Sequence, residues 1–106
     1  MNSVNLVGNL VRDWELSTTT AGKIVAKNSI AIRINKDKSI FVPLKAWNGT
    51  ATLLSDYSSK GHRIAISGSI DIDTYESEDK SKLNYYTYVL VDSVTFCERR
   101  SKDDNN

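Results

Sequence analysis

Residues 40–61 have the sequence IFVPLKAWNGTATLLSDYSSKG, and its first eight residues alternate in chemistry. Successive side chains of an extended chain point to opposite faces, so Val42, Leu44 and Ala46 share one face. The other face carries two aromatic rings and a cation, and its members are Phe41, Pro43, Lys45 and Trp47. The segment 40–47 is therefore predicted to be a β-strand whose aliphatic face lies in a core.

The second half of this stretch favours a short helix. Leu53, Leu54 and Tyr57 recur at the spacing of one helix face. The candidate residues for the two helix ends are Asn48, Thr50 and Gly61. Asn and Thr can cap the first backbone N–H groups of a helix, and glycine suits the left-handed conformation that often ends one. We expect this helix to cover one end of a barrel.

Four further segments have the two-residue alternation of strands. They are residues 3–11, 26–35, 63–75 and 85–96. Polar stretches at 18–23, 35–39 and 76–82 are expected to form the turns between them. Five strands with a helix between the third and the fourth is the order of an OB-fold barrel. We therefore predict an all-β chain, a five-stranded OB-fold barrel with one short helix between strands 3 and 4.

The alternation also predicts which side chains of two segments point inward. For segment 26–35 they are Ala26, Asn28, Ile30, Ile32 and Ile34. For segment 63–75 they are Ile64, Ile66, Gly68, Ile70 and Ile72. Asp71, Asp73 and Tyr75 are expected on the outer face of segment 63–75.

Length and composition favour one globular domain, since 106 residues suffice for one core and 40% of them are hydrophobic. We expect the domain to span residues 1–97 and residues 98–106 to form a polar, flexible tail. The single cysteine, Cys97, has no partner for a disulfide within the chain. No long apolar run predicts a signal peptide or a membrane span, so we expect a cytoplasmic or nucleoid-associated protein of a bacterial host cell.

The net charge of +1 does not by itself indicate a nucleic-acid partner. The distribution is uneven, because residues 1–70 hold nine Lys or Arg against four acids, and residues 71–106 hold five against nine. This gradient could form a basic groove, and scattered solvated lysines explain it equally well.

Residues 1–10 have the sequence MNSVNLVGNL, and Asp13 and Glu15 follow them. This stretch is similar to the opening M-N-x-V-x-L-x-G-x-L-x-x-D-P-E of the bacterial single-stranded-DNA-binding protein family. The motifs that follow are YSSKG at 57–61, ISGSI at 66–70 and VDSVTF at 91–96. The matches span about residues 1–97, and their order makes a chance resemblance improbable.

The resemblance implies sequence-independent binding and protection of single-stranded DNA in replication, recombination or repair, with no catalysis and no cofactor. By resemblance, bases stack on Phe41, Trp47 and Tyr75, and each stacked base contributes about 1 to 3 kcal/mol. The cations on or beside the same surface are Arg33, Lys36, Lys38 and Lys45, and they could neutralise phosphates. The alternatives are that the rings cover a subunit interface or shield the barrel, and that each cation is merely solvated.

The chain also departs from the family pattern. Trp14 occupies the place of the usual proline, where it either packs on the barrel or adds a stacking surface. Asp71 and Asp73 stand where relatives often carry cations, and they would repel phosphate. Residues 98–106 lack the usual apolar tip that recruits replication and recombination proteins. A phage or plasmid origin, or a truncated chain, would each account for that.

Two other classes of function are compatible with the sequence. One is an OB-fold module that docks proteins of a replication assembly. Another is a metal-dependent nuclease that uses acids of the fourth strand and the following turn, namely Asp71, Asp73, Glu76, Glu78 and Asp79. The lone His62 has no ligand partner at metal-site spacing, so no metal site is expected. By resemblance, we expect a homo-oligomer, most simply a tetramer, with Val7, Tyr86 and Tyr88 as interface candidates.

Overall fold

Six strands and one helix follow one another along residues 1–97, which are the residues that the computed structural model describes. They are β1 (Val4–Leu10), β2 (Glu15–Thr18), β3 (Ile24–Asn35), β4 (Lys38–Trp47), α1 (Asn48–Tyr57), β5 (Arg63–Glu76) and β6 (Leu83–Phe96). The predicted polar tail, residues 98–106, lies outside the described residues.

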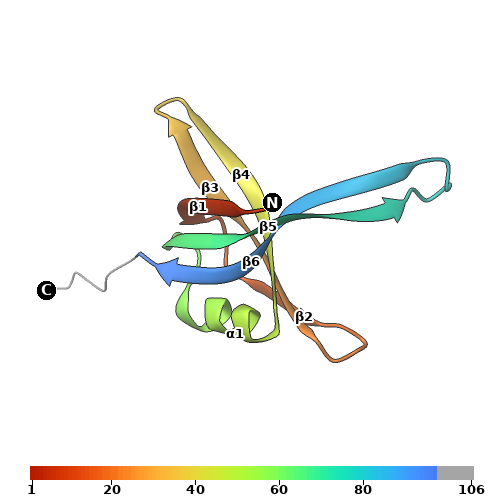
Figure 1. Ribbon diagram of the computed structural model, residues 1–106, viewed down its shortest axis with the longest axis horizontal. Helices are drawn as coiled ribbons and strands as arrows, with labels where there is room; N and C mark the ends of the chain where they lie inside the picture. The colour runs from red at the N-terminus through yellow and green to blue at the C-terminus, as the bar shows by residue number, and fades with distance from the viewer. Residues whose placement is uncertain (98–106) are drawn as a thin grey trace, which may run out of the picture.

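The strands form one sheet in the order β1-β5-β6-β4-β3-β2, and an additional β1–β3 pairing closes five of them into a barrel. The β4–β6 ladder is parallel, and its paired residues are Leu44 with Val89 and Lys45 with Leu90. The other pairings are antiparallel. Helix α1 lies between β4 and β5 in the chain (Figure 1). The predicted OB-fold barrel is confirmed, and β2, which pairs with β3 outside the ring, is an addition.

The core lies inside the barrel and under α1, as the alternation along β4 predicts. Leu44 and Ala46 are buried, and Val42 packs against the same cluster. Helix α1 contributes Ala51 and Leu54 to it. The other buried members of the cluster are Leu10, Ala26, Ile30, Ile64, Ile66, Val89 and Val91. Burial of these aliphatic side chains is the main force that holds the strands together.

Two inward-facing glycines allow strands to pass very close to one another. A Cβ atom on Gly8 would lie 2.3 Å from the carbonyl oxygen of Ala31, and one on Gly68 would lie 1.9 Å from that of Leu90. The β5–β6 register also shifts between Ser67 and Gly68. The extra residue of this bulge is Asp92 of β6, since Ser67 pairs with Ser93 and Gly68 pairs with Val91.

The β3–β4 and β5–β6 hairpins extend beyond the barrel (Figure 1). We call residues 32–41 the β3–β4 arm and residues 70–88 the β5–β6 arm. Within each arm the two strands pair with each other. The prediction that Ile34, Ile70 and Ile72 face a core is wrong, because these side chains are 53%, 48% and 50% exposed. They lie on the expected face of their strands, but the arms have no second layer to cover that face.

The ends of α1 differ from the predicted caps. Trp47 occupies the N-cap position without a side-chain hydrogen bond. The Asn48 side chain instead accepts a hydrogen bond from the backbone N–H of Ile24, at 3.1 Å. The helix ends before Ser58, whose N–H and hydroxyl both donate to the carbonyl of Leu54. Gly61 does adopt the left-handed conformation, with φ of +87°, but in the turn that leads into β5.

Trp14 anchors the β1–β2 connection to the barrel. Its ring packs against the core cluster, and its indole N–H donates to the hydroxyl of Ser58 at 3.0 Å. Of the two predicted alternatives for Trp14, the structure supports packing. Across residues 1–97, α1 is a helix of ten residues, and no helix there has the length and apolarity needed to cross a bilayer.

Candidate nucleic-acid interface

The outer face of the β3–β4 arm presents the aromatic ring that the sequence singled out. Phe41 lies opposite Ala31 in the β3–β4 ladder and is 65% exposed. Trp47 lies on the same face of β4 and is partly buried. Trp47 follows Phe41 by six positions, which corresponds to about 20 Å along a strand. The predicted outward orientation of both rings agrees with the structure, and their role in binding stays a prediction.

Three of the predicted cations gather near the tip of the same arm. Arg33 lies opposite Ser39, two residues from Phe41, and is exposed. Its guanidinium donates to the carbonyls of Asn35 at 3.3 Å and Lys36 at 3.5 Å, which orients it toward the turn. Lys36 and Lys38 flank that turn and are also exposed. The arm therefore combines an exposed ring with positive charge.

Tyr75 lies on the other arm. It is 56% exposed and pairs with Asn84, so its side chain shares a face with Asp71, Asp73 and Tyr86 of the same hairpin. Tyr86 stacks on Tyr88 with a centroid distance of 5.9 Å and an interplanar angle of 29°. The structure does not bring Tyr75 to Phe41, because the two rings belong to different arms.

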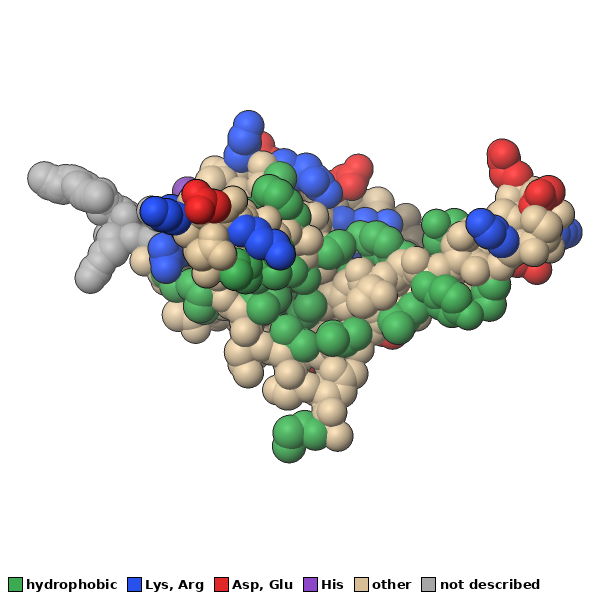
Figure 2. All heavy atoms as spheres, turned by 90° about the horizontal axis from the view of Figure 1, so that it is seen from above, with side chains coloured by type: hydrophobic (Ala, Val, Ile, Leu, Met, Phe, Trp, Pro, Cys, Tyr) green, Lys and Arg blue, Asp and Glu red, His purple; other side chains and the backbone are tan. Residues whose placement is uncertain are grey.

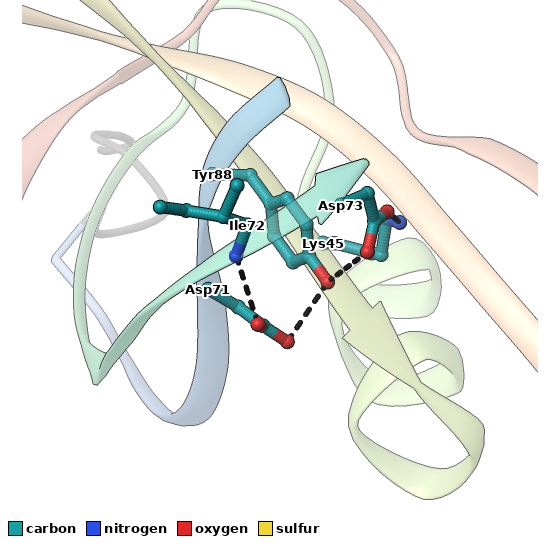
Figure 3. Close-up of polar contacts among 5 residues, drawn as sticks. All are labelled: Lys45, Asp71, Ile72, Asp73 and Tyr88. Atoms are coloured by element: carbon teal, nitrogen blue, oxygen red, sulfur yellow. Dashed lines mark hydrogen bonds and ion pairs between the residues drawn. The ribbon is translucent and has the colours of Figure 1, made fainter. Parts of the chain in front are cut away.

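Lys45 differs from the other predicted cations because the protein itself engages its charge. The ammonium group lies 2.8 Å from Asp73 Oδ2 and 4.3 Å above the centroid of the Tyr88 ring. Its side chain is only 11% exposed. Figure 3 shows Lys45 and Asp73 side by side with the Tyr88 ring next to them. Lys45 lies on the predicted face, but it is already paired within the protein.

The Tyr88 hydroxyl lies between two carboxylates, 3.0 Å from Asp71 Oδ2 and 3.2 Å from Asp73 Oδ1 (Figure 3). Burial raises the pKa of Tyr88, and the hydrogen bond to Asp71 adds to this, so the hydroxyl keeps its proton. The hydrogen bond from Lys45 lowers the pKa of Asp73, so that carboxylate stays ionised. The outer face of the β5–β6 arm therefore carries negative charge next to its tyrosines.

Asp79, at the tip of this arm, has structural partners of its own. Asp79 accepts hydrogen bonds from the hydroxyls of Ser77 and Ser81 within the hairpin tip, and these bonds lower its pKa to about 2. His62 accepts a hydrogen bond from the N–H of Ser59 through Nδ1. Among residues 1–97, no group of three or more His, Cys, Asp or Glu is arranged to hold a metal ion.

The sequence did not single out Arg63. The structure places it beside Asn9, at the rim of a hollow between β1, β3 and β5 that Arg33 and Ser39 also line. Ala31, the partner of Phe41 in the ladder, is part of the same lining. Positive charge thus extends from the arm onto the barrel. Nothing in the local pattern could reveal this, since Arg33 and Arg63 meet only through the pairing of β1 with both β3 and β5.

Comparisons with known proteins show the family to which the chain is similar. Residues 1–97 match the model of a family described as the single-strand binding protein family. The chain is 36% identical over 111 aligned residues to a single-stranded DNA-binding protein of Clostridium tetani, covering 99% of this chain and 76% of that protein. It is 34% identical over 108 residues to single-stranded DNA-binding protein B of Bacillus subtilis, covering 96% of this chain and 95% of that protein. A single-stranded DNA-binding protein of Fusobacterium nucleatum is 35% identical over 109 residues, covering 95% of this chain and 70% of that protein.

Proposed function

The chain belongs to the single-strand binding protein family, and we propose on this basis that it binds single-stranded DNA without reading base sequence, on the outer face of the β3–β4 arm and β4. One observation carries the assignment of this surface. Phe41 is 65% exposed on the same arm that carries Arg33, Lys36 and Lys38. An exposed ring beside cations matches the two parts of a nucleic-acid strand, the base and the phosphate.

Stacking explains why the binding is limited to unpaired strands and tolerates any sequence. Bases of a duplex already stack on one another, whereas a single strand can turn a base outward onto a protein ring. The Phe41 ring has no hydrogen-bond donor or acceptor, so it cannot distinguish base edges. Trp47, which lies on the same face and closer to the barrel, is the second stacking position of the proposal.

The cations at the arm tip are proposed to contact phosphates. Arg33, Lys36 and Lys38 are exposed, and the first is held toward the turn by its own backbone contacts. Each phosphate contact on a single strand adds about 0.7 to the slope of log affinity against log salt. Lys45 is left out of this set, because Asp73 neutralises it. Tyr75 is proposed as a stacking position that the strand reaches on the second arm.

We further propose a homo-oligomer, which the apolar back face of the β5–β6 arm supports. Exposed side chains on this face are Ile70 at 48%, Ile72 at 50%, Leu83 at 54% and Tyr85 at 65%. Figure 2 shows hydrophobic side chains along this arm. A second chain would cover them, and a tetramer is the state we propose. Roles in replication, recombination or repair inside the bacterial cytoplasm belong to the same proposal, as does the absence of catalysis.

A fluorescence titration tests the proposed function. The Trp14→Phe variant leaves Trp47 as the tryptophan signal, because the sequence has two tryptophans. We expect thymidine oligomers to quench this signal, with an affinity that falls as salt rises and that changes little between homopolymer sequences. A duplex of equal length should bind far more weakly. Equal affinity for duplex and single strand would contradict the proposal, and shortening of the oligomer in the presence of Mg²⁺ would indicate the nuclease instead.

A further inference from the structure

The β5–β6 arm is joined to β4 by a short seam. The parallel pairing of β4 with β6 comprises Leu44 with Val89 and Lys45 with Leu90. Beyond Val89 the arm is a two-stranded hairpin whose strands pair with each other. Isolated two-stranded ribbons are only marginally stable and twist readily. The backbone alone therefore does little to fix the direction in which this arm leaves the barrel.

A polar cluster lies at the end of that seam and joins three strands (Figure 3). Lys45 comes from β4, Asp71 and Asp73 come from β5, and Tyr88 comes from β6. Tyr88 directly precedes Val89 of the seam, and Lys45 is itself one of the seam residues. The cluster continues the connection between β4 and the arm with side chains, where the backbone ladder has ended.

Asp73, on β5, is the member of this cluster that accepts hydrogen bonds from both of the other strands, β4 and β6. Its Oδ2 accepts from the Lys45 ammonium at 2.8 Å, and its Oδ1 accepts from the Tyr88 hydroxyl at 3.2 Å. The Tyr88 ring covers the same ammonium, which lies 4.3 Å from its centroid. A nearly buried ammonium requires such a partner, because an unpaired charge there would lose its hydration without compensation.

We propose that Asp73 is a positioning residue, which fixes the β5–β6 arm against β4 and so holds Tyr75 and Tyr86 in a set place relative to Phe41. The inference rests on the proposed function and adds a role for an acid on a DNA-binding surface. A strand that touches Phe41 on one arm and Tyr75 on the other needs a defined distance between the arms. Asp73 maintains that distance without contacting DNA itself.

A simple repulsive charge at Asp73 would give the opposite result, and this makes the proposal testable. Replacing Asp73 with asparagine removes negative charge from the binding face and frees Lys45 for phosphate. If charge alone mattered, Asp73→Asn would tighten DNA binding at low salt. If Asp73 positions the arm, the same variant weakens binding of strands that are long enough to reach both arms.

The distance between the arm tips measures positioning directly. Spin labels on Asp37→Cys and Glu78→Cys report it in the full chain, with Cys97→Ser to remove the native thiol. Labelled chains are diluted with unlabelled ones, so that only distances within a chain contribute. We expect a narrow distance distribution that becomes broad in Asp73→Asn and in Lys45→Met. Asp73→Glu, which keeps the carboxylate, should restore much of the narrow distribution and so separates positioning from loss of the fold.

The affinity for thymidine oligomers of two lengths then tests whether the position of the arm affects DNA binding. With about four thymidines, which one arm can hold, we expect Asp73→Asn to bind as well as the unaltered chain or more tightly. With about sixteen, which span a whole OB fold, its affinity should fall about five-fold. Glu76→Gln is the matched control, because it removes one charge from the same strand outside the cluster, and it should leave both the distance distribution and the long-strand affinity unchanged.

An unchanged distance distribution in Asp73→Asn overturns the proposal, and so does long-strand binding that is unchanged or tighter. The proposed function fails in a different way. If the unaltered chain bound neither oligomer, DNA binding on this surface would be refuted, while the distance distribution would still decide whether Asp73 positions the arm.

Discussion

The two arms leave the same barrel as similar hairpins but carry opposite chemistry. The β3–β4 arm carries Phe41 and Arg33 on its outer side, with the cations Lys36 and Lys38 at its tip. The β5–β6 arm carries tyrosines beside two carboxylates on its outer side and an uncovered apolar back. In the proposed function, the first arm holds both the base and the phosphate of a nucleotide. The second arm can offer rings to bases, but it repels phosphates.

An aromatic ring does not by itself define a binding position. Tyr75 and Phe41 are similarly exposed, at 56% and 65%. Their surroundings differ in charge, so the free energy of placing the same nucleotide on each of them must differ. The β3–β4 arm is therefore expected to dominate affinity, and the β5–β6 arm to guide the strand after the first contact.

The largest expected effect follows removal of the ring on the basic arm. Phe41→Ala should weaken single-strand binding by about 2 kcal/mol, or roughly thirty-fold, because one stacked base loses its platform. Tyr75→Ala should weaken single-strand binding less than Phe41→Ala does. Tyr57→Ala is the matched control, since Tyr57 is 67% exposed, lies on α1 and contacts Phe96 rather than the proposed face. Fluorescence titration measures all three, and a larger loss for Tyr75→Ala would reverse the assignment of the arms.

A smaller effect is expected from the charges at the two arm tips. Replacing Lys36 and Lys38 with glutamine should lower the slope of log affinity against log salt by about 1.4, and lower the affinity at about 0.1 M salt some twenty-fold. The same replacements of Lys80 and Lys82, at the tip of the β5–β6 arm, should leave the slope unchanged. Titrations at four salt concentrations provide the slopes. Equal changes for the two pairs would mean that both tips contact phosphate.

The smallest expected effect is on the free energy of unfolding and on how it changes at acid pH. The Asp73 pKa is lowered below its ordinary value of 3.8, first by the hydrogen bond from Lys45 and further by the charges of Lys45 and Lys27 and by Tyr88. A carboxyl whose pKa is lower in the folded state stabilises the fold above its unfolded pKa, and this contribution is lost as pH falls through the folded pKa. Asp71 shares the Tyr88 hydroxyl and faces the same group.

At neutral pH, Asp73→Asn should therefore lower the free energy of unfolding by at most about 1 kcal/mol, because Asp73 is half exposed and solvent screens the pair. At a pH below the folded pKa of Asp73, the variant and the unaltered chain should be nearly equal in stability. Urea unfolding at the two pH values measures the difference. A difference of the same size at both would show that the ion pair contributes nothing.

Alternation predicted the strands well because it reports which side chains share a face. Leu44 and Ala46 of β4 are inside the barrel, and Phe41 is outside, as expected. The same pattern cannot report whether a second layer covers that face. Ile70 and Ile72 continue the inward series of Ile64 and Ile66, yet they lie beyond the barrel. The length of a barrel depends on where the other strands end. The sequence of one strand does not contain that information.

The parts of the candidate site that were not predicted depend on residues far apart in the sequence. The local pattern predicts that Lys45 is a solvated cation, because its partner Asp73 lies 28 residues away in the sequence. Arg33 and Arg63 share a hollow only because β1 pairs with two different strands. Strand β2 was missed because its four residues are all exposed, so no buried face produced an alternating signal.

The pairing of β1 with β5 has a consequence for biosynthesis. Val4 pairs with Gly68, and Leu44 of β4 pairs with Val89 of β6. Strand β1 therefore leaves the ribosome long before its partner exists, and the ring closes only after β6 has emerged. Topologies with such distant partners fold slowly for their size, and unpaired strand edges are prone to join other chains meanwhile. The nascent chain is thus most exposed to aggregation until its last strand has been made.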